Sequence, residues 1–121
     1  AIVLGPSNPV ISIGPILAIP GMREAIAAAR APVVAVSPYV AGEVVKGPTD
    51  RFMEAIGRPT TAAGVASLYA GLIDGIVVDE GDPDPPPTDV PHLATATLME
   101  GSAGRARLAR IVLDYAESLA G

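Results

Sequence analysis

A short group of glycine, hydroxyl and amide residues follows the first apolar run of the chain. Ala1–Leu4 is continuously apolar and stops at Gly5, and Ser7, Asn8 and Ser12 come next. This order indicates a buried strand that turns into a helix, where free backbone N–H groups and hydroxyls bind anions such as phosphate. The alternative is an ordinary turn with Ser12 as the helix cap. On the residues alone that plainer interpretation is favoured, because one such turn is a weak signal.

A second group of candidates lies in the loop after the next apolar run, Val33–Val36. Ser37 and Pro38 open this loop, and Lys46 lies further along it. Open parallel α/β sheets bind ligands outside the carboxyl ends of their strands, so this loop is predicted to reach the same sheet edge as the first turn. The Lys46 ammonium could neutralise a phosphate there. A solvated surface lysine is an equally good interpretation.

Four acidic residues follow a third apolar run, and Mg²⁺ prefers carboxylate and phosphate oxygens. They are Asp79, Glu80, Asp82 and Asp84. A solvated acidic loop is the favoured interpretation, so no metal ligand is assigned. No catalytic residue is named either, because the chain has no cysteine and a single histidine without partners at metal-ligand spacing. Neither a Gly-x-Gly-x-x-Gly nor a Walker motif occurs.

Buried strands that alternate with helices are predicted to position these groups. Apolar runs indicate strands at 1–4, 33–36 and 75–79, and a weaker pattern that contains Pro91 and His92 indicates a last strand at 90–95. Helices are predicted after a Ser12 cap, at 22–30, from Pro48 to about 57, from Thr60 or Thr61 to about 70, and from a Ser102 cap to 119. Residues 37–49 and the proline-rich 83–91 are expected to be irregular. This order predicts an α/β fold with a mostly parallel sheet in three layers.

Length and composition restrict the classes of protein to consider. The 121 residues are 50% hydrophobic and 17% charged, which predicts one packed domain over 1–121, or a piece of one. A net charge of −5 argues against nucleic acid and anionic membrane surfaces as partners. No apolar run approaches a membrane span, and the absence of cysteine favours a cytoplasmic location. Because Ala1 begins directly in strand-like sequence, an incomplete domain is expected.

Several strings of residues stand in a recognisable order along nearly the whole chain. They are Gly5–Leu17, Ala31–Pro38, Lys46–Pro48, Leu72–Gly75 and Asp79-Glu80. In sequence and spacing they resemble the C-terminal part of the 2-phospho-L-lactate transferase family. The resemblance implies a Rossmann-related α/β enzyme of coenzyme F-420 biosynthesis, of which this chain is the C-terminal portion.

Members of that family look like enzymes that transfer a phospholactyl group, or in related bacterial enzymes a phosphoenolpyruvyl group. The donor is linked to guanosine diphosphate, the acceptor is the deazaflavin Fo, and GMP is released. The resemblance also implies Mg²⁺, with ligands outside this chain, and a homodimer. Carried over residue by residue, it assigns donor phosphate oxygens to Gly5, Ser7, Asn8 and Ser12. It assigns the lining of the same cleft to Ser37, Pro38 and Lys46.

The chain also departs from the pattern of this family. Tyr39 and Ala41 stand where Ile and Gly are usual, Leu68 where His is common, and Ala96 where Asp is expected. The resemblance places the Gly-rich nucleotide loop and the metal-binding aspartates of the family in an N-terminal part that this sequence lacks. Two alternatives therefore stay open: a truncated or diverged nucleotide-phosphate-binding module without turnover, and a structural α/β subunit that docks onto a partner chain.

Overall fold

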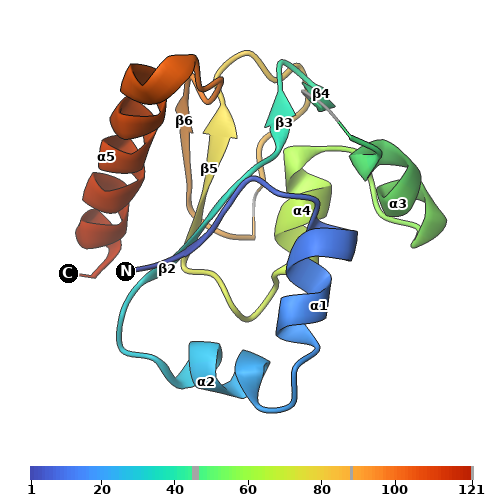
Figure 1. Cartoon of the computed structure of the whole chain (residues 1–121), viewed down its shortest axis with the longest axis vertical. Coiled ribbons are helices and arrows are strands. Elements are labelled where there is room, and N and C mark those ends of the chain that lie inside the picture. Colours follow the sequence, from blue (N-terminus) through green and yellow to red (C-terminus); the bar gives the residue numbers. More distant parts are fainter. Residues whose placement is uncertain (45–46, 88, 121) are drawn as a thin grey trace.

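A four-stranded parallel sheet forms the centre of the molecule. The computed structural model describes residues 1–44, 47–87 and 89–120. The strands lie in the order β1 (Ile2–Leu4), β2 (Val33–Val36), β5 (Gly75–Asp79) and β6 (His92–Thr95). All neighbouring pairs are parallel, so the carboxyl ends of the strands share one edge (Figure 1). The predicted α/β fold with a mostly parallel sheet is confirmed.

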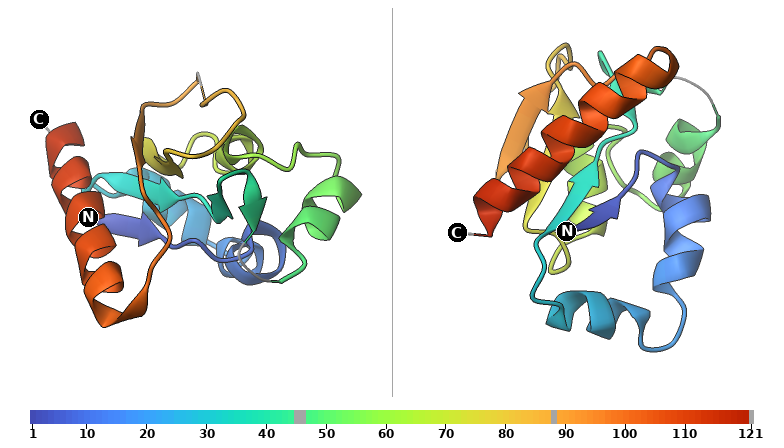
Figure 2. Two further views of the ribbon diagram at one scale, coloured as in Figure 1. Left: turned by 90° about the horizontal axis from the view of Figure 1, so that it is seen from above. Right: turned by 60° about the vertical axis from the view of Figure 1, so that its left-hand side comes forward.

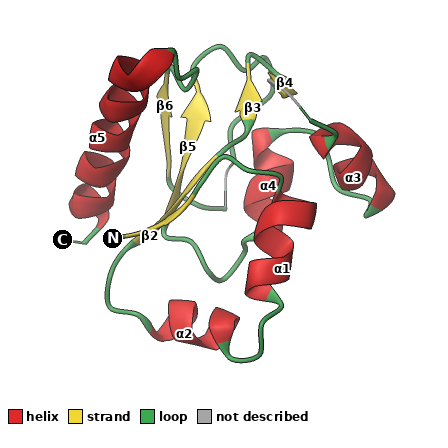
Figure 3. Cartoon of the chain, in the orientation of Figure 1, coloured by secondary structure: helices red, strands yellow, loops and turns green. Residues whose placement is uncertain are grey.

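Helices cover both faces of this sheet. They are η1 (Pro9–Ile13, a π-helical turn), α1 (Gly14–Leu17), α2 (Met22–Ala28), α3 (Thr49–Ala55), α4 (Ala62–Leu68) and α5 (Gly101–Leu119). Viewed from above, α5 lies on one side of the strands and α1, α3 and α4 on the other (Figure 2). Figure 3 shows the loops that join helices and strands, several of which gather at the carboxyl edge.

Two apolar clusters fill the spaces between sheet and helices. Successive side chains of a strand point to opposite faces, and β2 shows this directly. Its Val33 and Ala35 pack in the cluster that includes α1 and α4, whereas Val34 and Val36 pack with α5. All four are buried, as expected for a strand that is covered on both faces. The three-layer arrangement therefore follows from the continuously apolar runs.

Two predicted helix caps are wrong. The helical segment before α1 begins at Pro9, and its cap is Asn8, whose Oδ1 accepts hydrogen bonds from two backbone N–H groups. Pro9 explains this earlier start, because its fixed φ and missing N–H suit the first helical position. Ser102 lies inside the first turn of α5, which begins at Gly101 without a side-chain cap. The predicted cap Thr61 is confirmed, since its hydroxyl accepts from Gly64 N.

A small hairpin replaces part of the irregular loop predicted after β2. Strands β3 (Tyr39–Val40) and β4 (Glu43–Val44) are antiparallel and are joined by Ala41 and Gly42. Both connecting residues have positive φ, 53° and 82°, as a two-residue turn of type I′ requires. Alanine is rare in this conformation, which is why the sequence did not reveal the turn.

The proline-rich segment before β6 contains no helix or strand in its described residues, 83–87 and 89–91. Its predicted irregular conformation is confirmed, although Pro87 is buried rather than exposed. Over the described ranges, no single helix is long and apolar enough to cross a membrane. One bent pair, Pro9–Leu17 with Met22–Ala28, meets the same length and composition criterion together.

Candidate functional site

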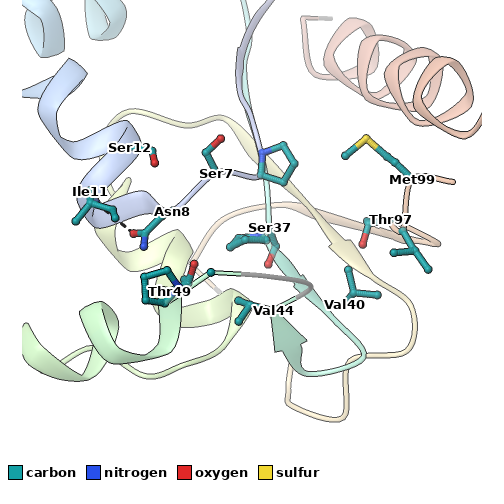
Figure 4. Close-up of a pocket in the computed structure, with 15 residues that line it drawn as sticks. Ser7, Asn8, Ile11, Ser12, Ser37, Val40, Val44, Thr49, Thr97 and Met99 are labelled. Carbon is teal, nitrogen blue, oxygen red and sulfur yellow. Dashed lines mark hydrogen bonds between the residues drawn. The ribbon is translucent and has the colours of Figure 1, made fainter. Parts of the chain in front are cut away.

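An open pocket of about 580 Å³ lies at the carboxyl edge of the sheet. Segments far apart in the sequence line it: the turn after β1, the loop after β2, the start of α3 and the segment after β6 (Figure 4). The lining residues are Pro6, Ser7, Asn8, Ile11, Ser12, Ser37, Pro38, Val40, Val44, Gly47, Pro48, Thr49, Thr97, Leu98 and Met99. None of these described residues carries a charged side chain.

The pocket brings together most of the residues predicted from the sequence. Ser7, Asn8, Ser12, Ser37 and Pro38 all line it, although they come from two loops about 30 positions apart. Gly5 stands just before this lining and is not part of it. Lys46 lies outside the residues that the structure describes, so its predicted role stays a prediction. Its neighbours Gly47 and Pro48 do line the pocket.

The four backbone N–H groups of residues 10–13, at the start of the helical segment, are already satisfied and are not free for an anion. Asn8 Oδ1 accepts from Val10 N at 2.9 Å and from Ile11 N at 3.2 Å. The Asn8 carbonyl accepts from Ser12 N and Ile13 N at 3.0 and 3.1 Å. The first N–H groups of a helix have no carbonyl partner within the helix, and here the Asn8 side-chain oxygen accepts from two of them. Asn8 therefore occupies the position that the sequence analysis assigned to an anion.

The side chains of Ser7, Asn8 and Ser12 supply further hydrogen-bond donors at this turn. With Asn8 Oδ1 occupied, its Nδ2 is buried and has no partner in the described structure. The Ser7 and Ser12 side chains are exposed. In Figure 4 the Ser7 hydroxyl is turned away from the Asn8 amide, so these groups do not form one tight cluster. This side of the pocket, the polar bank, therefore offers uncharged N–H and O–H hydrogen-bond donors to a ligand.

Two threonines in the pocket were missed by sequence analysis. Thr49 is the first residue of α3 and Thr97 follows the end of β6, and each is only 4% exposed. The position of Thr97 was a usable signal, because it stands just past the carboxyl end of a predicted strand. Thr49 becomes recognisable only once the hairpin folds back and brings the start of α3 to the edge.

The opposite bank of the pocket is apolar. Val40 and Val44 come from the hairpin, and Leu98 and Met99 from the segment before α5. Leu98 and Met99 are 44% and 40% exposed, whereas Ile11, which is 47% exposed, lines the pocket beside Asn8 (Figure 4). A ligand with a polar end and an apolar or aromatic end would match both banks.

The acidic segment after β5 is largely structural. Asp79 is 8% exposed, and its carboxylate accepts four hydrogen bonds, from Thr97 N, Thr97 Oγ1, Ala41 N and Gly81 N, at 2.9 to 3.1 Å. Burial alone would raise the pKa of Asp79, but these hydrogen bonds outweigh it and hold the pKa below its ordinary value. The favoured interpretation of a solvated loop is wrong for this residue.

Asp82 is in a different electrostatic position. Its Oδ1 accepts from Gly42 N at 2.9 Å, whereas its Oδ2 is buried without a partner. Burial raises the pKa of Asp82, and the nearby charges of Asp79 and Asp84 add to the shift. Within 1–44, 47–87 and 89–120, no three His, Cys, Asp or Glu side chains are grouped to hold a metal ion. The resemblance places the Mg²⁺ ligands outside this chain, so the Mg²⁺ stays a prediction.

Comparison with known proteins decides the family. Residues 1–103 match the family described as 2-phospho-L-lactate transferase CofD. The chain belongs to this family. The match covers every described segment that lines the pocket, since the last lining residue is Met99.

Curated relatives agree with this membership of the CofD family. A phosphoenolpyruvate transferase of Kitasatospora aureofaciens is 43% identical over 123 residues, which cover 98% of the chain and 38% of the relative. A 2-phospho-L-lactate transferase of Methanothermobacter thermautotrophicus is 40% identical over 117 residues, 93% of the chain and 37% of the relative. A phosphoenolpyruvate transferase of Streptomyces coelicolor is 54% identical over 84 residues, 69% of the chain and 26% of the relative. The chain thus spans less than two fifths of the length of these relatives.

Proposed function

We propose that this CofD-family chain forms the phosphate-binding part of a transferase of coenzyme F-420 biosynthesis. The donor would carry a phospholactyl or phosphoenolpyruvyl group linked to guanosine diphosphate, and the acceptor would be the deazaflavin Fo. One observation carries the proposal: the polar side chains that the sequence singled out line one open pocket at the carboxyl edge. Relatives named for each of the two transfers match the chain.

The reaction is a displacement at phosphorus. A hydroxyl oxygen of Fo attacks the phosphorus that bears the three-carbon group, and a new P–O bond forms. The P–O bond to the guanosine phosphate breaks, GMP leaves with the electron pair, and the hydroxyl proton is released. Little covalent chemistry falls to the protein in such transfers, so positioning and charge stabilisation dominate.

The described residues have distinct tasks in this scheme. Asn8 Nδ2 and the Ser12 and Ser37 hydroxyls would donate hydrogen bonds to phosphoryl oxygens. Ser37 is 1% exposed, and its Oγ already accepts from Tyr39 N at 3.2 Å, which leaves its own O–H to donate to a ligand. The apolar bank with Leu98 and Met99 would exclude water and pack against the ring system of a substrate. Lys46 stays the predicted cation.

A binding module without turnover is the second candidate. It is favoured by the described lining, which contains no Asp, Glu, His or Lys side chain to move a proton. The Mg²⁺ requirement, the homodimer and the cytoplasmic location stay predictions from the sequence.

An activity assay separates the two candidates. The protein is incubated with the guanosine-linked donor, Fo and Mg²⁺, and GMP and the Fo product are measured by chromatography. Stoichiometric formation of both products supports the transferase. Binding of GDP without product supports the module, and absence of both activity and GDP binding contradicts the assignment of the pocket.

A further inference from the structure

One buried carboxylate, Asp79, joins the two segments that form the apolar bank of the pocket, without lining the pocket itself. It is the last residue of β5, and it does not belong to the lining. Its Oδ1 accepts from Thr97 N at 2.9 Å and Thr97 Oγ1 at 3.0 Å. Its Oδ2 accepts from Ala41 N at 3.1 Å and Gly81 N at 2.9 Å. The two oxygens therefore hold different parts of the chain.

The first of these parts is the hairpin that supplies Val40 and Val44 to the pocket. Its turn places Ala41 at φ 53°, a left-handed conformation that disfavours any residue with a Cβ. The Asp79 carboxylate accepts from Ala41 N, and Asp82 Oδ1 accepts from the next residue, Gly42. These two carboxylates hold the strained turn in place. The hydrogen bonds to Asp79 and Asp82 therefore fix where the hairpin places Val40 and Val44.

The second part is the segment Thr97–Met99, which runs from β6 to α5 along the opposite end of the pocket from Asn8 (Figure 4). Thr97 is 4% exposed, and both its N–H and its hydroxyl are directed to Asp79 Oδ1. Leu98 and Met99 follow at once and are exposed in the pocket. Asp79 therefore fixes the point from which these two side chains reach the ligand.

We infer that Asp79 is a positioning residue that fixes the apolar bank of the pocket and hence sets the affinity of the pocket for the guanosine-linked donor. It acts through Thr97 and Ala41 and does not touch the ligand. The inference rests on the proposed function, because it needs a phosphate-bearing ligand in this pocket. It also assigns a role to Asp79 other than holding a metal, since both of its oxygens are occupied by donors of the chain.

The direction in which GDP affinity changes when Asp79 is substituted distinguishes a positioning role from a purely electrostatic one. A negative charge near the site repels the phosphates, so its removal alone would tighten binding of an anion. If Asp79 positions the two segments of the apolar bank, removal of its charge weakens binding instead. Asp79→Asn is a suitable change, because an amide accepts at one oxygen and cannot hold both Thr97 and the Ala41 turn. Glu80→Gln is the matched control, because Glu80 is adjacent, exposed and loses the same charge.

The experiment titrates GDP into the protein and its variants by calorimetry, at a temperature where thermal unfolding curves show that each is folded. Asp79→Asn is expected to weaken GDP binding by about tenfold, within the range by which residues that do not touch a ligand change its affinity. Glu80→Gln is expected to bind as tightly as the unaltered protein or more tightly. A folded Asp79→Asn protein with unchanged or tighter GDP binding overturns the inference.

Changes at Thr97 keep the test decisive if Asp79→Asn does not fold. Thr97→Val keeps the shape of the side chain but removes the hydroxyl donor, whereas Thr97→Ser keeps it. We expect GDP binding to weaken about threefold to tenfold in the valine variant, as for other residues that act without touching the ligand, and to stay within about twofold in the serine variant. Equal binding by both variants overturns the inference. If the unaltered protein binds no GDP, the proposed function itself fails, and the inference falls with it.

Discussion

The Tyr39 hydroxyl donates a hydrogen bond of 2.8 Å to Asp50 Oδ1, which joins the hairpin to the first turn of α3. Tyr39 is fully buried, and burial together with this hydrogen bond raises the pKa of its phenol far above the ordinary value. Ile is usual at this position in the pattern that the sequence resembles. A buried tyrosine is tolerated here because Asp50 satisfies its hydroxyl.

Tyr39→Phe is expected to destabilise the protein by about 1–2 kcal/mol, because it removes a hydrogen bond to a carboxylate but keeps the buried ring. Thermal or denaturant unfolding measures this loss. Asp50→Asn is the matched change, since an amide oxygen still accepts from Tyr39, and it is expected to cost less. Equal stability of Tyr39→Phe and the unaltered protein would show that the hydrogen bond contributes nothing.

Asn8 combines a structural and a binding role, and two substitutions separate them. Asn8→Ala removes the cap and is expected to cost about 0.5–2 kcal/mol of stability as well as GDP affinity. Asn8→Asp keeps an oxygen acceptor for Val10 N and Ile11 N but loses the Nδ2 donor and adds a negative charge. This variant is expected to unfold at the same temperature as the unaltered protein, or higher, and to lose GDP binding. Retained GDP affinity in Asn8→Asp would remove Asn8 from the site.

Ser12 offers a test that leaves stability aside. Its side chain is exposed and does not cap the helix, so Ser12→Ala is expected to change the free energy of unfolding by less than about 0.5 kcal/mol. GDP affinity measured by calorimetry is nevertheless expected to fall several-fold. Ser102→Ala is the control, because Ser102 is an exposed serine in another helix, away from the pocket lining. If the two variants bind GDP alike, Ser12 has no part in binding.

The lowered pKa of Asp79 predicts a loss of stability in acid. Because this pKa is lower in the folded protein, the unfolded chain binds the proton first as the pH falls through the ordinary value of about 3.9. The stabilisation is complete above that pH and disappears below the folded pKa. Urea unfolding at several pH values is therefore expected to show Asp79→Asn less stable by about 1.5–3 kcal/mol at neutral pH, with a difference that shrinks in acid.

Asp82 is expected to have the opposite effect on the free energy of unfolding in the same urea experiment. Its raised pKa means that the folded protein binds the proton more tightly, so the charged Asp82 lowers stability at neutral pH. Asp82→Asn is expected to be as stable as the unaltered protein at pH 7, or more stable, and to lose that advantage in acid. The same acid profile for both variants would contradict the roles assigned to these carboxylates.

Three strands of the sheet were predictable from the sequence because β1, β2 and β5 are short and largely apolar, whereas β6 (His92–Thr95) alternates exposed and half-buried residues. Val33–Val36 is buried on both faces, and no polar residue interrupts the pattern. Because the strands are parallel, the loops after β1 and β2 meet at the same edge of the sheet, where ligands bind. Ser7 and Ser37 could therefore be placed at one site from the sequence alone.

The details that depend on hydrogen bonds could not be predicted. Asn8 and Ser12 are both acceptable caps, and the choice between them depends on where Pro9 starts the helix. The hairpin was hidden because Ala41 adopts a positive φ that is stabilised by Asp79, 38 residues further along the chain. An acidic residue after a strand looks solvated in a sequence. Only the fold shows that four donors surround it.

The most direct test of the pocket assignment is nuclear magnetic resonance of the protein titrated with GDP, observed at the Asn8 side-chain amide. This group has no partner in the described structure, and we propose that it donates to a phosphoryl oxygen. Saturating GDP is expected to shift its resonances, together with the backbone amides of Ser12, Ser37 and Thr97. The backbone amide of Ser67, on α4 and outside the pocket lining, serves as the reference. An Asn8 amide that stays unshifted at saturation would contradict the account.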